Sequence, residues 1–200
     1  MAETNTPTTV LREEHQLILK VLDALERVLN KGSAVSAQDV ETLAKYVSFF
    51  RLFADACHHG KEEDLLFPEL EARGIPREGG PIGVMLAEHE QGRGFVRQMH
   101  EALPGARAGE AAAVDALVSA GRDYIDLLRQ HIDKENNVLF MMADRVVDES
   151  SCARLCGEYA HVCSGKFSGQ TKDELQELAA ELIRAAVESG AGGDRASAET

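Results

Sequence analysis

The chain has 200 residues and a formal net charge of −13, and 44% of its residues are hydrophobic. This length fits one domain with a short appendage. The negative charge argues against nucleic acid or an anionic membrane as a partner, because both require a basic surface. No apolar run approaches the roughly 20 residues of a spanning helix, and MAETNTPTTV lacks the regions of a signal peptide. We therefore expect a cytoplasmic protein whose cysteines are free thiols.

The first predicted helix covers about residues 8–31. One face repeats at alternating spacings of four and three residues, which is the pattern of a packed helix. Its members are Leu11, His15, Ile18, Leu22, Leu25 and Leu29. A loop capped near Ser36 leads to a second predicted helix over about residues 40–72. His58 lies on its apolar face, and Pro68 is expected to kink or tighten its last turn.

The third predicted helix covers about residues 82–103, with His89 on its apolar face, and PGARAGE is predicted to be a loop. The fourth covers about residues 111–147 and carries His131 and Glu135 on its face. Because the connections are short, neighbouring helices should be antiparallel. The sequence therefore predicts an all-α, up-down-up-down four-helix bundle over residues 8–147.

The remaining residues form two further predicted segments. Residues 148–189 are expected to be a short helical extension, in which Thr171 and Glu174 form a capping box. Residues 190–200 are expected to be a disordered tail.

Each of the four apolar faces contains a histidine, and in a bundle these four can meet at one level of the core. Two of the histidines are followed four residues later by a glutamate. They are His58 with Glu62 and His131 with Glu135. Residues at this spacing lie one above the other on a helix, so both side chains can reach the same ion.

The two His-Glu segments are also an internal repeat. HHGKEEDLLF and HIDKENNVLF share the pattern H-x-x-K-E-x-x-h-L-F, where h is apolar. The repeat selects His58 and Glu62 over their neighbours His59 and Glu63, which are expected to point towards the edge or solvent. Four imidazoles and two carboxylates suit two first-row transition ions bridged by carboxylates, and they exceed the needs of one tetrahedral zinc.

The stretches HHGKEEDLLFPEL, GPIGVMLAEHE and HIDKENNVLF together resemble the hemerythrin-like, or HHE cation-binding, family over about residues 8–147. The resemblance implies an antiparallel four-helix bundle with a non-haem di-iron site, usually oxo- or hydroxo-bridged. Carried over to this chain, the implied ligands are His15, His58, Glu62, His89, His131 and Glu135. The two glutamates would bridge the irons.

One departure from the family pattern concerns the third helix. Oxygen-carrying hemerythrins have a second histidine four residues from the ligand on this helix, whereas this chain has Arg93 and Met85. With four histidines, one coordination position is expected to be open, which resembles members linked to iron sensing, nitric oxide or peroxide chemistry, and repair of iron centres. Simple oxygen transport is disfavoured. Glu90, Glu63 and His59 are candidates for a further ligand.

Ferritin-like proteins are a second family of di-iron helical bundles. Ferritin-like di-iron bundles place a glutamate three residues before a ligand histidine on two helices, but here Asp55 and Leu128 occupy those positions. The expected function is binding of, or reaction with, O2, peroxide or nitric oxide at two irons for sensing, scavenging or oxygen handling. The alternatives are an iron-sensing or storage module without turnover, and a bundle with a structural metal or none.

Overall fold

The computed structural model describes residues 6–164 and 169–191. All regular elements within these ranges are helices, which confirms the prediction of an all-α chain. None of the described helices is both long enough and apolar enough to cross a membrane. The last helix extends through Ala191 and so includes residue 190, where the predicted tail was expected to begin. The rest of that predicted tail, residues 192–200, lies outside the described ranges.

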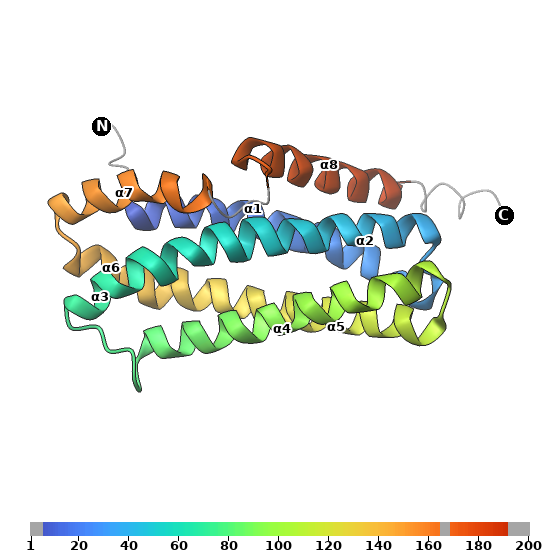
Figure 1. The fold of residues 1–200 in the computed structure, drawn as a ribbon, viewed down its shortest axis with the longest axis horizontal. Coiled ribbons are helices and arrows are strands. Elements are labelled where there is room, and N and C mark those ends of the chain that lie inside the picture. Colours follow the sequence, from blue (N-terminus) through green and yellow to red (C-terminus); the bar gives the residue numbers. More distant parts are fainter. Residues whose placement is uncertain (1–5, 165–168, 192–200) are drawn as a thin grey trace.

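The helices run lengthwise beside one another and form a bundle (Figure 1). In this view α1 runs from left to right, α2 and α3 return, α4 runs to the right again, and α5 and α6 return. A short 3₁₀ helix, η1 (Gly32–Ala34), follows α1. The bounds are α1 Pro7–Leu29, α2 Ala37–Phe49, α3 Phe67–Ala72, α4 Pro81–Arg107, α5 Ala111–Lys134 and α6 Phe140–Val146.

The start of α2 shows how local sequence sets a helix boundary. The Ser36 hydroxyl accepts a hydrogen bond from the Asp39 backbone N–H at 3.2 Å. The Asp39 carboxylate accepts one from the Ser36 N–H at 2.9 Å. These two bonds satisfy donors that a helix start leaves unpaired, and they confirm the cap predicted near Ser36.

The second and fourth long helices contain π-helical segments, which the sequence did not indicate. They are η2 (Phe50–His59), η3 (Glu62–Leu66) and η4 (Glu135–Leu139). A π-helix bonds residue i to residue i+5 and so has more residues per turn than an α-helix. Pro68 stands in the first turn of α3, directly after η3, where its missing N–H is least costly.

The end of α4 lies beyond its predicted position. We expected a loop from Pro104, but the helix continues to Arg107 with Pro104 inside it. Leu103 and Ala106 are buried on either side of the proline, and the Arg107 guanidinium binds the Glu41 carboxylate at 2.7 Å. These contacts hold the last turn against the loss of one backbone hydrogen bond.

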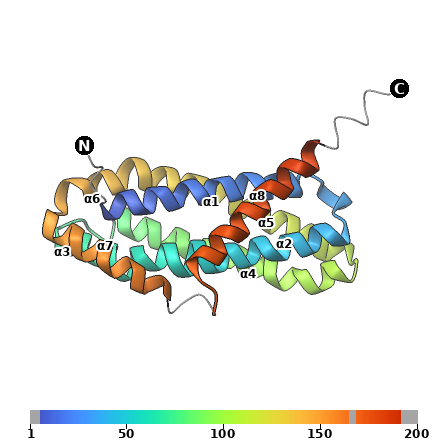
Figure 2. The same ribbon diagram turned by 90° about the horizontal axis from the view of Figure 1, so that it is seen from above.

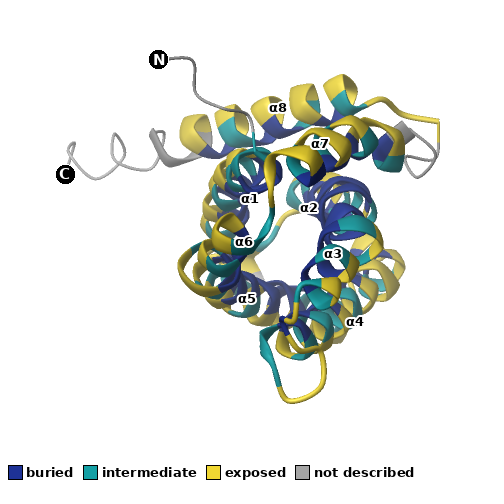
Figure 3. Ribbon diagram, turned by 90° about the vertical axis from the view of Figure 1, so that its left-hand side faces the viewer, coloured by how far each residue is buried: buried dark blue, intermediate teal, exposed yellow. Residues whose placement is uncertain are grey.

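The core lies along the axis of the bundle, where buried residues face inward (Figure 3). A layer of histidines and glutamates divides it into two apolar clusters. On α1, for example, His15 stands between Leu11 of one cluster and Ile18 of the other. Apolar packing on both sides therefore fixes the height of the polar layer and excludes water from it.

Two further helices, α7 (Glu149–Ser164) and α8 (Lys172–Ala191), lie outside the bundle. α8 crosses over α1 and α2 (Figures 2 and 3). The predicted capping box at its start is confirmed, because the Glu174 carboxylate accepts from the Thr171 N–H at 2.7 Å and the Thr171 hydroxyl accepts from the Glu174 N–H at 3.2 Å.

The expectation that all four cysteines are free thiols was wrong for two of them. Cys57 in η2 and Cys163 in α7 form a disulfide, whereas Cys152 is a free thiol. The partners are separated by 106 residues. Only the packing of α7 against η2 brings them together, and spacing along the sequence contains no signal of it.

Candidate metal centre

The six residues singled out from the sequence meet in the polar layer of the core. They come from α1, from the π-helical segments, from α4 and from the junction of α5 with η4, and each is at most 1% exposed. They are His15, His58, Glu62, His89, His131 and Glu135. Burying so many polar groups is costly unless they are paired or bind a metal.

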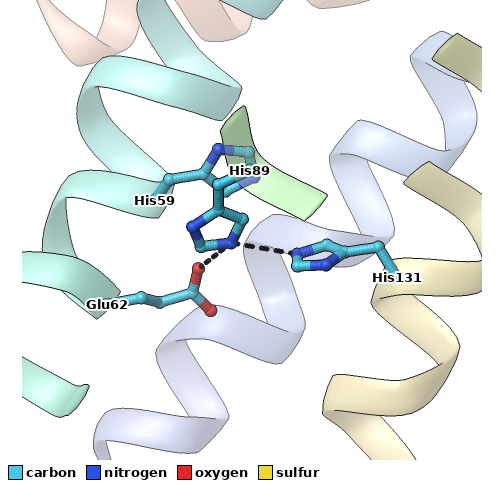
Figure 4. Close-up of side chains that lie close together, drawn as sticks. All are labelled: His59, Glu62, His89 and His131. Carbon is cyan, nitrogen blue, oxygen red and sulfur yellow. Dashed lines mark hydrogen bonds and ion pairs between the residues drawn. The ribbon is translucent and has the colours of Figure 1, made fainter. Parts of the chain in front are cut away.

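The side chains form two groups in which the potential ligand atoms all lie within 4.8 Å of one another. One group contains three imidazoles, and its members are His59, Glu62, His89 and His131 (Figure 4). The other contains two imidazoles, and its members are His15, His58, Glu62 and Glu135. Glu62 belongs to both groups, so the layer offers two adjacent positions for a cation.

His59 belongs to this site, although the sequence analysis placed it towards the edge or solvent. It is only 4% exposed, and its ring stacks on that of His89 at 3.9 Å between centroids. The error has a physical cause. The face prediction assumed 3.6 residues per turn, but η2 is π-helical, so both His58 and His59 turn into the core.

Each of the two buried glutamates lies between a histidine of one group and a histidine of the other. Glu135 Oε2 is 3.1 Å from His15 Nε2 and 3.2 Å from His131 Nε2. Glu62 Oε1 is 3.7 Å from His58 Nε2, and its Oε2 is 3.5 Å from His89 Nε2. This arrangement is what carboxylates that bridge two cations require.

The imidazoles are held by hydrogen bonds from their outer nitrogen. His15 Nδ1 donates to Asn136 Oδ1 at 2.9 Å, and His89 Nδ1 donates to Glu63 Oε1 at 2.7 Å. With Nδ1 protonated, the lone pair is on Nε2, which in His15 has no hydrogen-bond partner among the described residues and in His89 lies 3.1 Å from His131 Nε2. Such bonds fix the tautomer and orientation of metal-binding histidines.

Two more of the site histidines, His58 and His131, are held by carboxylates that the sequence analysis missed. His58 Nδ1 donates to Glu14 at 3.1 Å, and Lys61 donates to the same carboxylate. These contacts are repeated around Glu88, which accepts from His131 Nδ1 at 3.0 Å and from Lys134. The signal was present in the sequence, because each carboxylate directly precedes a site histidine in REEHQ and LAEHE.

The two H-x-x-K-E segments therefore also make equivalent contacts in the fold, but their contributions to the site are not identical. The lysine of each H-x-x-K-E segment neutralises the carboxylate that orients its histidine, which explains why the lysine is part of the repeat. The two segments differ at five positions, and two of these concern residues of the site or its surroundings. His59 corresponds to Ile132, and Glu63 corresponds to Asn136. The first difference gives one cation position an imidazole that the other lacks.

The unpaired atoms of the layer fit a metal. Buried atoms without a hydrogen-bond partner in the described chain include His15 Nε2, His58 Nε2, both Glu62 oxygens and both Glu135 oxygens. Nearly all buried polar groups in folded proteins are paired. All of these nitrogen and oxygen atoms are of the types that coordinate first-row transition ions. The residues present therefore fit two such ions.

The ionisation of the site reflects its burial. Burial, followed by the neighbouring His15, lowers the pKa of His58 to about 3, so this imidazole is neutral and can act as a ligand. Burial and the nearby Glu135 carboxylate raise the pKa of Glu62 well above its usual value. A cation would replace the proton that this carboxylate otherwise takes up.

Two other candidates for an additional ligand lie outside the groups. Glu63 is on the outer side of His89 and also accepts from Arg93 at 2.6 Å. The Glu90 side chain is 67% exposed and faces the Arg93 guanidinium at 3.6 Å. Of the three candidates raised by the sequence, the structure brings only His59 into the site.

The C-terminal helices also reach the surroundings of the site. Lys172 at the start of α8 donates to Glu14 at 2.8 Å. Tyr159 of α7 is buried, and the Lys61 ammonium lies 5.8 Å from the centre of its ring. The charge on Glu14 is thus balanced by lysines from two parts of the chain. The hydrogen bond to His58, followed by the charges of Lys61 and Lys172, keeps the pKa of this carboxyl far below its usual range despite the burial.

The chain is similar in sequence to known proteins. A family model described as the Hemerythrin HHE cation binding domain matches residues 6–143. The iron-sulfur cluster repair protein YtfE of Enterobacter sp. (strain 638) is 32% identical over 136 residues, which are 66% of this chain and 60% of that protein. YtfE of Salmonella newport (strain SL254) is 35% identical over 89 residues, 43% of this chain and 40% of that protein.

The chain thus spans less than two thirds of the length of these curated relatives. The family model, in contrast, covers well over half of the chain and includes every histidine and glutamate of the two groups. The resemblance seen in the sequence is confirmed, and the chain belongs to the hemerythrin HHE cation-binding domain family.

Proposed function

We propose that this chain is a non-haem di-iron protein that binds or reacts with a small ligand such as nitric oxide, peroxide or O2. The three-histidine position would hold one iron and the two-histidine position the other. Glu62 and Glu135 would contribute to both, because each lies between histidines of the two groups. When bound, iron supplies a redox-active Lewis acid in this otherwise inert core.

One observation supports the proposal most strongly, namely that six inward-facing nitrogen and oxygen atoms of His15, His58, Glu62 and Glu135 are buried without a hydrogen-bond partner among the described residues. The protein provides everything around them. The outer hydrogen bonds orient the imidazoles, Lys61 and Lys134 balance the orienting carboxylates, and the apolar clusters keep water out. A site built in this way favours cations that take imidazole and carboxylate together.

The difference between the halves of the repeat favours one position for the small ligand. The two irons would share both glutamates. The iron at the three-histidine position would then have three imidazoles, and the iron at the two-histidine position only two. The sequence analysis inferred an open position from four histidines. With His59 the candidate histidine ligands would be five, and the open position would be at the iron next to His15 and His58. Ile132 is the counterpart of His59 in the repeat and is buried, so it would give this position an apolar side chain in place of an imidazole.

The relatives indicate the setting in which such a ligand would be met. Both are named as iron-sulfur cluster repair proteins. We therefore favour a role in handling nitric oxide or peroxide, or in supplying iron to damaged iron centres, over simple oxygen transport. An iron-sensing or storage role without turnover is the alternative, and the same metal centre would serve it.

Stopped-flow spectroscopy of the iron-loaded protein tests this function. Anaerobic, reduced protein is mixed with nitric oxide, peroxide or O2, and the optical spectrum and consumption of the ligand are followed. The proposal expects a spectral change at stoichiometric ligand, and repeated consumption with a reductant would indicate turnover. A spectral change without consumption favours the sensing role. Iron-loaded protein that responds to none of the three ligands would contradict the proposal and favour the iron-sensing or storage role.

A further inference from the structure

A pocket of about 300 Å³ lies between η2 and α4 and ends at His59. Its floor is formed by buried residues, among them Gly92, Val96 and the ring of Tyr124. A volume of this size is at the lower end of the range for small-molecule sites. It is thus large enough for a compact organic molecule and larger than a diatomic ligand needs.

Gly92 keeps the floor open. A Cβ atom at this position would lie 3.5 Å from the Tyr124 ring and 3.7 Å from Leu127, which is ordinary contact. Alanine would therefore be tolerated here, whereas a longer side chain would have to occupy the pocket. The absence of a side chain maintains the space next to His59.

The mouth of the pocket is cationic, although the chain as a whole is strongly acidic. Arg51, Arg97 and His100 line it and are exposed. Within the described chain, Arg51 and His100 have no hydrogen bond or ion pair, and Arg97 has only a long ion pair of 3.9 Å to Glu90. Their donors are therefore available to a ligand.

The third arginine of the pocket, Arg93, is already neutralised. Arg93 donates to Asp55 at 2.7 Å and to Glu63 at 2.6 Å. It fixes one wall and does not add to the free charge. The available charge thus lies at the mouth, and the floor is apolar, so the pocket suits a molecule with an anionic head and a short apolar body.

We infer that this pocket binds a small organic monocarboxylate, with its carboxylate at Arg51 and Arg97 and its apolar body against Val96 and Tyr124. The site is separate from the open position next to His15 and His58, because neither of these histidines lines the pocket. Its occupant would contact the ring of His59, which stacks on His89. Binding is therefore expected to alter the absorption spectrum of the metal centre.

Benzoate is a suitable probe, and neutral benzamide is its matched control. Titration of the iron-loaded full-length chain by calorimetry should give one benzoate site, with benzamide bound about tenfold more weakly or worse, because hydrogen bonds to charged groups are the stronger ones. Arg51→Gln and Arg97→Gln should each weaken benzoate binding by a similar factor. Arg27→Gln, which changes an exposed arginine on α1, should have no effect.

Gly92→Leu should abolish benzoate binding without changing the iron content. If this variant fails to fold, the variants of the exposed Arg51 and Arg97 still test the inference. Several results would overturn the inference. They are no benzoate binding up to about 10 mM, equal binding of benzamide, or full affinity in both arginine variants. Competition by azide without any effect of the arginine variants would place benzoate on the metal and overturn it too.

The inference does not depend on the proposed function. If the chain holds no iron but still binds benzoate in an arginine-dependent way, the di-iron proposal fails and the pocket remains. If iron is bound and reacts with nitric oxide but benzoate does not bind, only the pocket inference fails.

Discussion

The rings of His59 and His89 are stacked with their planes 13° apart, at the three-histidine end of the polar layer. This contact joins η2 to α4 and places His59 among the candidate ligands. The repeat alone assigns no role to His59, because its counterpart is Ile132. The structure reverses that interpretation and makes His59 the residue that distinguishes the two halves of the site.

His59→Ala is therefore expected to lower the iron content of the purified protein, since one position loses an imidazole. The measurement is metal analysis after anaerobic loading and desalting. His100→Ala is the control, because His100 is exposed and lies outside both groups. If His59→Ala and His100→Ala retain the same iron as the parent protein, His59 is not a ligand.

Glu14→Gln and Glu88→Gln are each expected to weaken iron binding about 10- to 100-fold, the usual effect of removing a partner of a ligand histidine. Each substitution removes the charge that orients a histidine and leaves a lysine without its partner. Competition with a chelator measures the affinity. Glu13→Gln, at an exposed neighbouring position, serves as the control, and equal affinities for all three variants would contradict the roles given to these carboxylates.

Ile132→His is expected to keep iron and to weaken azide binding to the oxidised protein at least about tenfold. The new imidazole occupies the place that corresponds to His59 and competes for the open coordination position. Titration of the azide absorption band measures the effect, with circular dichroism to verify folding. Ile132→Leu preserves the apolar surface and should bind azide normally. Unchanged azide affinity in folded Ile132→His protein would place the open position elsewhere.

Cys163→Ser is expected to reduce the free energy of unfolding by about 2–4 kcal/mol, because the disulfide to Cys57 closes a long loop in the unfolded chain. Urea unfolding of oxidised protein measures it. Cys152→Ser removes a free thiol and should have little effect. Adding a reductant should lower the stability of the parent to that of Cys163→Ser, and a parent that is insensitive to reductant would argue against the bond.

The helices and most of the site follow from patterns that need no tertiary information. Apolar spacing located the long helices, and the H-x-x-K-E repeat paired His58 with Glu62 and His131 with Glu135. Such patterns assume ideal α-helical geometry. They therefore failed where the π-helical segment η2 turns His59 inward. Segments of this kind are frequent at functional sites.

Other features depend on contacts between distant segments. The Glu-His pairs at residues 14–15 and 88–89 are visible in the sequence, but their roles emerge only when Lys61 and Lys134 are brought beside them. The disulfide is of the same kind, since it depends on the docking of α7. Contacts between residues that are distant in the sequence produce no periodic pattern, so a single sequence does not reveal them.

The central claim is that the polar layer holds two irons in unequal surroundings. A Mössbauer spectrum of protein loaded anaerobically with isotopically enriched iron tests it most directly. We expect the spectrum to contain two iron environments in equal amounts, and binding of azide or nitric oxide should shift the signal of one of them. A single environment at full loading, or stable folded protein that takes up one iron or none per chain, would contradict it.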